Sequence, residues 1–127
     1  MTTGSQPTVV DITDRCRDFV PDGADGLLSV FVPHATAGVA VLETGAGSDT
    51  DLLSLIDDLL PTDDRWTHRH GSRGHGRDHV LPAFISPSVT VPVLGGLLQL
   101  GTWQSLCLVD VNGDNPRRQV RLSFLPG

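Results

Sequence analysis

The spacing of apolar residues after a Gly-Ala-Gly break predicts the firmest helix of the chain. Asp49 and Asp51 occupy its first turn, where a helix N-terminus favours negative charge. Ser48 has the character of the N-cap, and Pro61 ends the helical run. A second, shorter helix is predicted over residues 14–20, where apolar side chains gather on one side. The apolar positions of the longer helix are Leu52, Leu55, Ile56, Leu59 and Leu60.

Strands are predicted wherever apolar and β-branched residues alternate or form short runs between turns. The strands at 27–32 and 38–42 are expected to be neighbours. Gly95-Gly96 is typical of a tight hairpin turn, and a second hairpin is predicted around residues 112–115. The predicted strands cover residues 8–12, 27–32, 38–42, 88–93, 97–100, 104–111 and 117–124.

Seven predicted strands with one firm helix favour an α+β fold. The chain has 127 residues, shows no internal repeat and fits one domain of about 100–200 residues. We therefore expect a compact single domain over residues 1–127. Its core is a curved, sandwich-like antiparallel β-sheet that carries one or two helices.

Composition excludes several classes of function. The net charge of −6 argues against binding to duplex nucleic acid, and an aromatic content of 5% argues against a base-stacking platform. No apolar run approaches the roughly 20 residues that span a membrane, and no secretory signal is visible. Cys16 and Cys107 both lie among apolar residues, as buried thiols do, so a cytoplasmic location is expected. The absence of lysine excludes lysine Schiff-base chemistry.

The stretch from residue 62 to residue 79 differs in composition from the rest of the chain. It holds four histidines, four arginines and three glycines, and loops this long in small domains are usually functional or disordered. His68-x-His70 and His75-x3-His79 place imidazoles at spacings that can share one metal ion such as zinc, copper, iron or nickel. His34, at a strand end, could complete such a site. The alternative is a solvated polar loop with no ligand.

Three other positions carry polar side chains suited to chemistry. Glu43 is the only glutamate and ends a strand, so it could act as a general base or a metal ligand, or be a solvated carboxylate. Thr102 and Gln104 offer groups that could hold a phosphate, or simply begin a strand beside a packed tryptophan. Arg117 and Arg118 are adjacent, so on a strand one would face a ligand and the other solvent, unless both are solvated.

Several short motifs follow one another in a fixed order along nearly the whole chain, from Val9 to Gly127. They are His34-Ala-Thr-Ala-Gly38, Glu43, Asp51-Leu52, Trp66-Thr-His68, His79-Val-Leu81, Ser88-Val-Thr-Val-Pro92, Leu100-Gly-Thr-Trp-Gln104 and Pro116-Arg-Arg118. This succession resembles the YjbQ-like family. The Gly-Thr-Trp-Gln motif among these neighbours is its most specific part.

The resemblance implies an α+β homotrimer with low-efficiency thiamine-phosphate synthase activity, which joins a pyrimidine pyrophosphate to a thiazole phosphate. It also implies that the matched polar residues line one shared cleft, which in the family's trimer would lie between subunits. The resemblance assigns catalytic roles to Glu43, His79 and Asp51, contacts with a small phosphorylated metabolite to Thr36, Thr102, Gln104 and Arg118, and a divalent metal, zinc or magnesium, to His34, His68 and His79.

Departures from the family pattern cluster in the histidine-rich stretch. His75, Arg77-Asp78 and Trp66 replace residues that are usual there, and Pro82 interrupts a run that is often helical. These changes bear on metal identity and loop shape more than on the fold. Two alternatives to an enzyme stay open: a non-catalytic homotrimeric module that binds a metal or metabolite, and a purely structural trimer.

Overall fold

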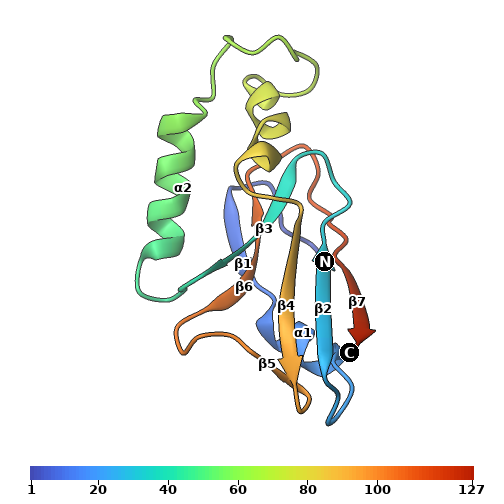
Figure 1. Cartoon of the computed structure of the whole chain (residues 1–127). Helices are drawn as coiled ribbons and strands as arrows, with labels where there is room; N and C mark the ends of the chain where they lie inside the picture. The colour runs from blue at the N-terminus through green and yellow to red at the C-terminus, as the bar shows by residue number, and fades with distance from the viewer.

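The computed structural model describes all 127 residues and contains two antiparallel sheets (Figure 1). One has the strand order β1-β6-β3 and the other the order β5-β4-β2-β7. The strands are β1 (Thr8–Asp11), β2 (Gly26–Phe31), β3 (Ala37–Leu42), β4 (Ser88–Leu94), β5 (Leu97–Leu98), β6 (Ser105–Asp110) and β7 (Arg121–Pro126). The helices are α1 (Thr13–Phe19), α2 (Ser48–Leu59) and two short 3-10 helices, η1 (His75–His79) and η2 (Leu81–Ala83).

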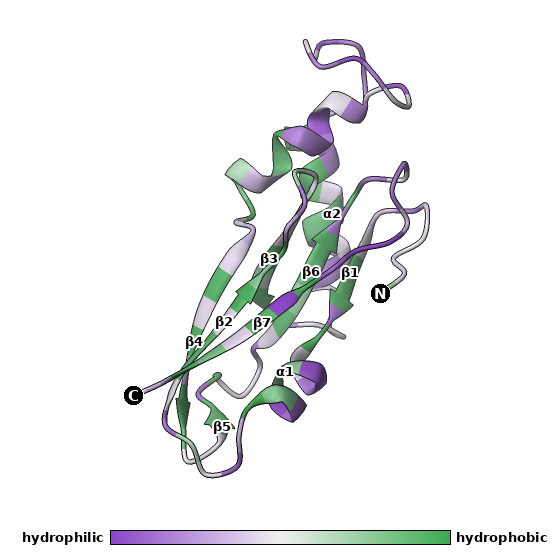
Figure 2. Ribbon diagram, turned by 90° about the vertical axis from the view of Figure 1, so that its right-hand side faces the viewer, coloured by the Kyte–Doolittle hydropathy of each residue, from purple (hydrophilic) through white to green (hydrophobic).

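The core lies between the two sheets because alternate residues of their strands point inward. Leu28 and Val30 of β2 pack in one cluster with Leu106 and Leu108 of β6, and Cys16 of α1 belongs to the same cluster. In Figure 2 the strands are mostly hydrophobic, whereas the loop at the top of the view is hydrophilic. The predicted α+β, sandwich-like architecture is therefore confirmed.

Strand β6 is buried on both faces. Its Val109 packs in a second cluster with Ile56 and Leu60 at the C-terminal end of α2 and with Leu81 of η2. This contact fixes α2 against the outer face of the three-stranded sheet. No helix of the chain is both long enough and apolar enough to cross a lipid bilayer.

Two predicted strand pairings were wrong. Strands β2 and β3 are not neighbours, because β2 pairs with β4 and β7, whereas β3 pairs with β6. The hairpin predicted around residues 112–115 is also absent, because the strands on its two sides belong to different sheets. Strand β6 pairs with β1 and β3, and β7 pairs with β2. Alternation identifies a strand but not its partner, so the sequence could not show that residues 32–36 and 111–120 cross from one sheet to the other.

Other local predictions were closer. The hairpin at Gly95-Gly96 is confirmed, with Val93 opposite Leu98, although β5 is only two residues long. The N-cap of α2 is Gly47, with a φ of 104°, and Ser48 is the first helical residue. Glycine suits that cap because a left-handed backbone costs it little.

Candidate metal centre and adjoining cavity

Three histidines converge where residues 62–74 fold back onto η1. One ligand nitrogen each from His68, His70 and His79 lies within 4.8 Å of the other two. The ring centroids of His68 and His79 are 3.8 Å apart, and those of His68 and His70 are 3.9 Å apart. The Nε2 atom of His68 is buried and has no hydrogen-bond partner. These three imidazoles could hold a metal ion.

The histidine loop, residues 62–79, is packed against the rest of the domain. A Cβ atom on Gly76 would meet the His68 carbonyl oxygen and the Trp66 Cβ, both at 2.4 Å, so only glycine allows the two segments to approach. Trp66 donates its indole N–H to the Pro61 carbonyl at 2.9 Å. Arg77 is buried and donates to Asp57 on α2. These contacts hold His68 and His79 in place and exclude a wholly solvated loop.

His75 lies beside the three converging histidines and is only 8% exposed. Its Nδ1 atom is 3.1 Å from a carboxylate oxygen of Asp114 and 3.2 Å from one of Asp78. Its Nε2 atom is 2.9 Å from the Nε2 atom of His79. Nδ1 of His75 makes no hydrogen bond with either carboxylate, so the two oxygens act on the ring as nearby negative charges.

The surroundings of His68 and His79 favour the neutral forms of these two imidazoles. Desolvation, together with the charge of neighbouring histidines, lowers the pKa of His68 and of His79. Burial raises the pKa of Asp78 to about 6, against the opposing effects of Arg77 and His75. Metal ions bind the neutral form of histidine, so the lowered pKa values help His68 and His79 to act as ligands near neutral pH.

A polar cavity of about 410 Å³ adjoins the histidines. On its far side Arg118 is 2% exposed and donates to both carboxylate oxygens of Asp110, at 2.7 and 2.9 Å. Arg118 also donates to Thr36 Oγ1 at 2.9 Å, while its Nη1 group makes no hydrogen bond within the chain. Residues of the wall are His34, Ala35, Thr36, His70, Gly71, His75, His79, Asn112, Asp114, Asn115 and Arg118.

The predicted convergence of all nine site residues on one pocket is not found within a single chain. His34, Thr36, His79 and Arg118 line the cavity, whereas His68 does not line it but clusters with His79. The others are exposed: Glu43 follows β3, Asp51 lies in the first turn of α2, and Thr102 and Gln104 precede β6.

The reason for this separation is the antiparallel pairing of β3 with β6. Ala37, next to Thr36, lies opposite Asp110, whereas Leu42, next to Glu43, lies opposite Ser105. The two groups therefore occupy opposite ends of these strands (Figure 1). The sequence places each residue at a strand end but does not show which ends coincide.

His34 also differs from its predicted position. His70, and not His34, stands with His68 and His79 in the compact triad. His34 lies across the cavity, where its Nε2 atom accepts a hydrogen bond from the Gln119 backbone N–H at 2.9 Å. Desolvation and the nearby charge of Arg118 lower the pKa of His34.

Comparison with known proteins identifies the family. The model of the UPF0047 protein YjbQ-like family matches residues 1–127. The chain belongs to the UPF0047, YjbQ-like family. A UPF0047 protein of Mycobacterium tuberculosis (strain H37Rv) is 66% identical over 119 residues, which cover 94% of this chain and 90% of the relative. A UPF0047 protein of Archaeoglobus fulgidus is 32% identical over 119 residues, which cover 93% and 92%.

Solved structures show the same fold. A hypothetical protein from Aeropyrum pernix superposes with a TM-score of 0.87 at 34% identity, covering 98% of this chain and 93% of that one. A YbjQ-like protein of unknown function from Sulfolobus solfataricus gives a TM-score of 0.87 at 26% identity, covering 98% and 91%. The UPF0047 family thus supplies the fold, and the chemistry has to be argued from the site.

Sequence reasoning missed part of the site in this UPF0047 protein. The spacing of His70 and His75 was a usable signal, but the family resemblance favoured His34 in place of His70. The carboxylates of Asp78, Asp110 and Asp114 gave no signal, because only the fold brings them to the histidines and to Arg118. Their roles depend on contacts between residues distant in sequence.

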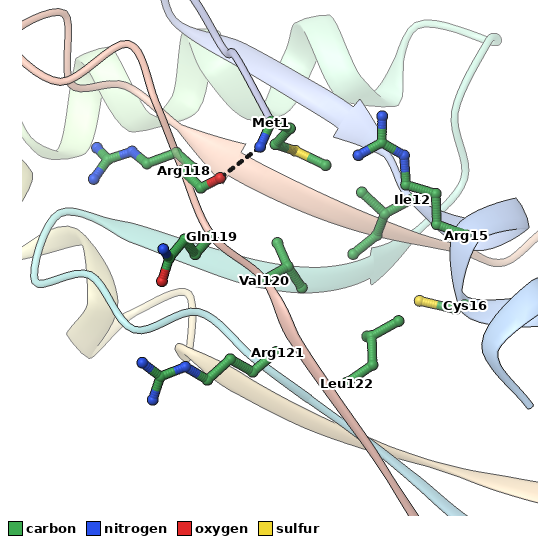
Figure 3. Close-up of a pocket in the computed structure, with 9 residues that line it drawn as sticks. All are labelled: Met1, Ile12, Arg15, Cys16, Arg118, Gln119, Val120, Arg121 and Leu122. Atoms are coloured by element: carbon green, nitrogen blue, oxygen red, sulfur yellow. Dashed lines mark hydrogen bonds between the residues drawn. The ribbon is translucent and has the colours of Figure 1, made fainter.

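A second cavity, of about 360 Å³, lies between α1 and residues 118–122 (Figure 3). Most of its wall is apolar, including Ile12, Val120 and the buried Cys16, and Arg15 and Arg121 add positive charge. The amino group of Met1 donates to the Arg118 carbonyl at 2.7 Å. Arg118 directs its side chain away from this cavity toward Asp110, so the histidine cavity is the one with convergent polar groups.

Proposed function

We propose that this UPF0047 protein is a low-efficiency thiamine-phosphate-synthase-like enzyme that binds a phosphorylated or pyrophosphorylated small molecule beside a divalent metal ion. The observation that carries this proposal is the buried, unpartnered Nε2 atom of His68. It lies with nitrogens of His70 and His79 within 4.8 Å. An unpaired buried polar atom costs about 1–3 kcal/mol, so a bound ion that used its lone pair would relieve that cost.

Of the two expected metals, the donor set fits zinc. His68, His70 and His79 offer imidazole nitrogen, which suits zinc, whereas magnesium prefers oxygen ligands. A bound zinc ion would supply positive charge next to the leaving pyrophosphate.

The adjoining cavity supports binding of an anion. Arg118 lines it, and the ion pair with Asp110 holds the guanidinium rigidly. Thr36 Oγ1 and the ring of His34 also reach this space. In the proposed reaction, Arg118 orients a phosphate group and Thr36 adds a hydroxyl to it.

The proposal includes a cytoplasmic homotrimer in which the site is shared between copies. Glu43, Asp51, Thr102 and Gln104 are exposed and lie far from the cavity of their own chain. In a trimer they would face the cavity of a neighbouring copy, where Glu43 would act as base and Thr102 and Gln104 would hold the substrate.

The same separation favours a second candidate function. If Glu43 faces solvent in the assembled protein, the cavity has side chains that can bind a ligand but no general base. The chain is then a non-catalytic homotrimeric module that binds a metal or a metabolite. Turnover distinguishes the two candidates.

The experiment follows formation of thiamine phosphate from the pyrimidine pyrophosphate and the thiazole phosphate. Turnover is expected with the untagged wild-type protein, and none with Glu43→Ala or with the His68→Ala/His79→Ala double variant. After the two inactive proteins are unfolded and refolded together, mixed trimers should regain part of the activity, because some sites then combine intact residues from two copies. Substrate binding without turnover by the wild type would select the non-catalytic module.

A further inference from the structure

Thr36 lies on the wall of the polar cavity beside the histidines, and its hydroxyl oxygen meets two other side chains of that wall. Arg118 Nη2 is 2.9 Å from Thr36 Oγ1, and Asn112 Nδ2 is also 2.9 Å from it. All three residues are buried: Thr36 and Asn112 are each 6% exposed, and Arg118 is 2% exposed. The direction of these two hydrogen bonds decides what the hydroxyl group of Thr36 can still do.

The side-chain amide of Asn112 has only one orientation that satisfies its neighbours. Its Oδ1 atom accepts a hydrogen bond from the backbone N–H of Asp114 at 2.8 Å. A backbone N–H group can only donate, so the atom that faces Asp114 is the amide oxygen and the atom that faces Thr36 is the amide nitrogen. Asn112 therefore donates to Thr36 Oγ1 and cannot accept from it.

Arg118 gives the second hydrogen bond the same direction. A guanidinium group carries only N–H donors and no acceptor, so Arg118 also donates to Thr36 Oγ1. The hydroxyl oxygen of Thr36 thus accepts two hydrogen bonds, which use both of its lone pairs. Its own hydrogen atom is left over and has to be donated to a third group.

The chain itself supplies no acceptor for that hydrogen atom. Asp110 is the carboxylate of this network, and its Oδ1 atom accepts from Arg118 at 2.9 Å and from the Asn112 backbone N–H at 3.0 Å. Its Oδ2 atom accepts from Arg118 and from the Thr3 hydroxyl, both at 2.7 Å. These hydrogen bonds fill the roughly four acceptor sites of a carboxylate. In both of its side-chain hydrogen bonds the Thr36 hydroxyl is the acceptor and not the donor.

We propose that Thr36 is a specificity-determining residue that donates its hydroxyl hydrogen to a phosphate oxygen of the ligand, and that Asn112 is the positioning residue that imposes this direction. Ionised phosphate oxygens are strong acceptors, and the charge of Arg118 beside Thr36 favours them further. An ammonium or amide N–H of a ligand would instead meet a donor, which selects against it. The inference rests on the proposed function and adds to it Asn112 and the direction of the Thr36 hydroxyl.

The experiment titrates inorganic phosphate into the full-length protein as purified and measures affinity by calorimetry at mildly alkaline pH. Thr36→Val keeps the branched shape of the side chain but removes the hydroxyl. We expect it to bind phosphate about 10–100-fold more weakly, because a hydrogen bond to a charged group is lost. Thr36→Ser keeps the hydroxyl and should bind phosphate nearly as well as the wild type. Equal phosphate affinity of Thr36→Val and the wild type would overturn the inference.

Asn112→Asp tests the positioning role without changing the shape of the side chain. The carboxylate that it introduces can still accept from the Asp114 N–H, but it would also accept the hydroxyl hydrogen of Thr36 and so withhold it from the ligand. Asn115→Asp is the matched control, because Asn115 lines the same cavity and makes no hydrogen bond with Thr36. We expect Asn112→Asp to weaken phosphate binding about tenfold more than Asn115→Asp.

A double-mutant cycle separates the direction of the hydroxyl from simple charge repulsion. In the Thr36→Val background the excess effect of Asn112→Asp should vanish, because no hydroxyl hydrogen is left to capture. An undiminished effect there would overturn the positioning role of Asn112.

The outcomes also distinguish this inference from the proposed function. If the wild type binds no phosphate, the anion cavity of the proposed function is wrong, and the inference falls with it. If the wild type binds phosphate and Thr36→Val binds it equally well, only the roles of Thr36 and Asn112 are wrong. If urea denaturation shows that Thr36→Val does not fold, the comparison of Asn112→Asp with Asn115→Asp decides, and equal losses would overturn the inference.

Discussion

At the scale of single residues, the two buried cysteines give the chain an unusual response to alkaline pH. Burial raises the pKa of Cys16 to about 11 and that of Cys107 to about 12, from an ordinary value of 9.0. With no tyrosine and no lysine in the sequence, no other side chain is expected to titrate between pH 9 and these values. The unfolded chain therefore releases protons first, and the native state becomes less stable as pH rises.

We expect the free energy of unfolding to fall steadily above pH 9.0 and to stop falling near the native thiol pKa values, about 11 and about 12. Urea unfolding at a series of pH values measures this slope. Replacing both cysteines by alanine should lower stability at neutral pH, because it removes buried side-chain volume, but should flatten the slope above pH 9.0. A double variant that kept the full slope would contradict this account.

Adjacent arginines offer a second contrast at this scale. Arg118 is 2% exposed and paired with Asp110, whereas Arg117 is exposed. Removing one partner of a buried ion pair leaves an uncompensated charge. Arg118→Ala should therefore reduce the free energy of unfolding by about 3–5 kcal/mol.

Arg117→Ala is the matched control, with an expected change within about 0.5 kcal/mol. Urea denaturation of both variants provides the comparison. Equal losses for the two arginines would show that the Arg118–Asp110 pair does not stabilise the domain.

At the scale of elements, the close approach of residues 66–68 to η1 builds the histidine cluster. Gly76 permits it, because a Cβ atom there would meet the His68 carbonyl oxygen at 2.4 Å. Gly76→Ala should move His68 away from His79 and weaken zinc binding at least about tenfold. The control is Gly101→Ala, where the nearest contact is the flexible end of Gln104 at 3.2 Å. Isothermal titration of zinc checks both, and equal affinities would contradict this reading.

Among the elements, the sequence predicts most strands and helices but not how the strands pair. The existence of the strands, α2 and the Gly95-Gly96 hairpin follows from local periodicity and turn chemistry and was predicted correctly. Two strand bounds were wrong: the last strand is Arg121–Pro126 and not 117–124, and β5 covers only Leu97–Leu98 of the predicted 97–100. The partners of β2, β3, β6 and β7 depend on which segments cross between sheets, and local patterns do not encode that choice. For the site, spacing suggested four histidines on one loop, but only the packed loop shows that His70 joins the triad and that two carboxylates lie beside His75.

At the scale of the whole molecule, the predicted site residues fall at two ends of one sheet. Histidines, Thr36 and Arg118 surround a cavity near one end of β3, while Glu43, Thr102 and Gln104 lie near the other. The histidine cluster at one end could hold a metal ion, and in the proposed function the adjoining cavity takes the anion. Its proposed catalytic role depends on a neighbouring copy that brings Glu43 to the cavity. Metal binding is therefore the part of the proposal that needs residues of only one chain.

The most direct test of that central claim is elemental analysis of untagged protein purified without added metal. We predict about one equivalent of zinc per chain in the wild type, and its loss in the His68→Ala/His79→Ala double variant, because His68 and His79 would supply two of the three proposed ligands. Wild-type protein without bound metal, or a double variant that retains the full equivalent, would contradict the account.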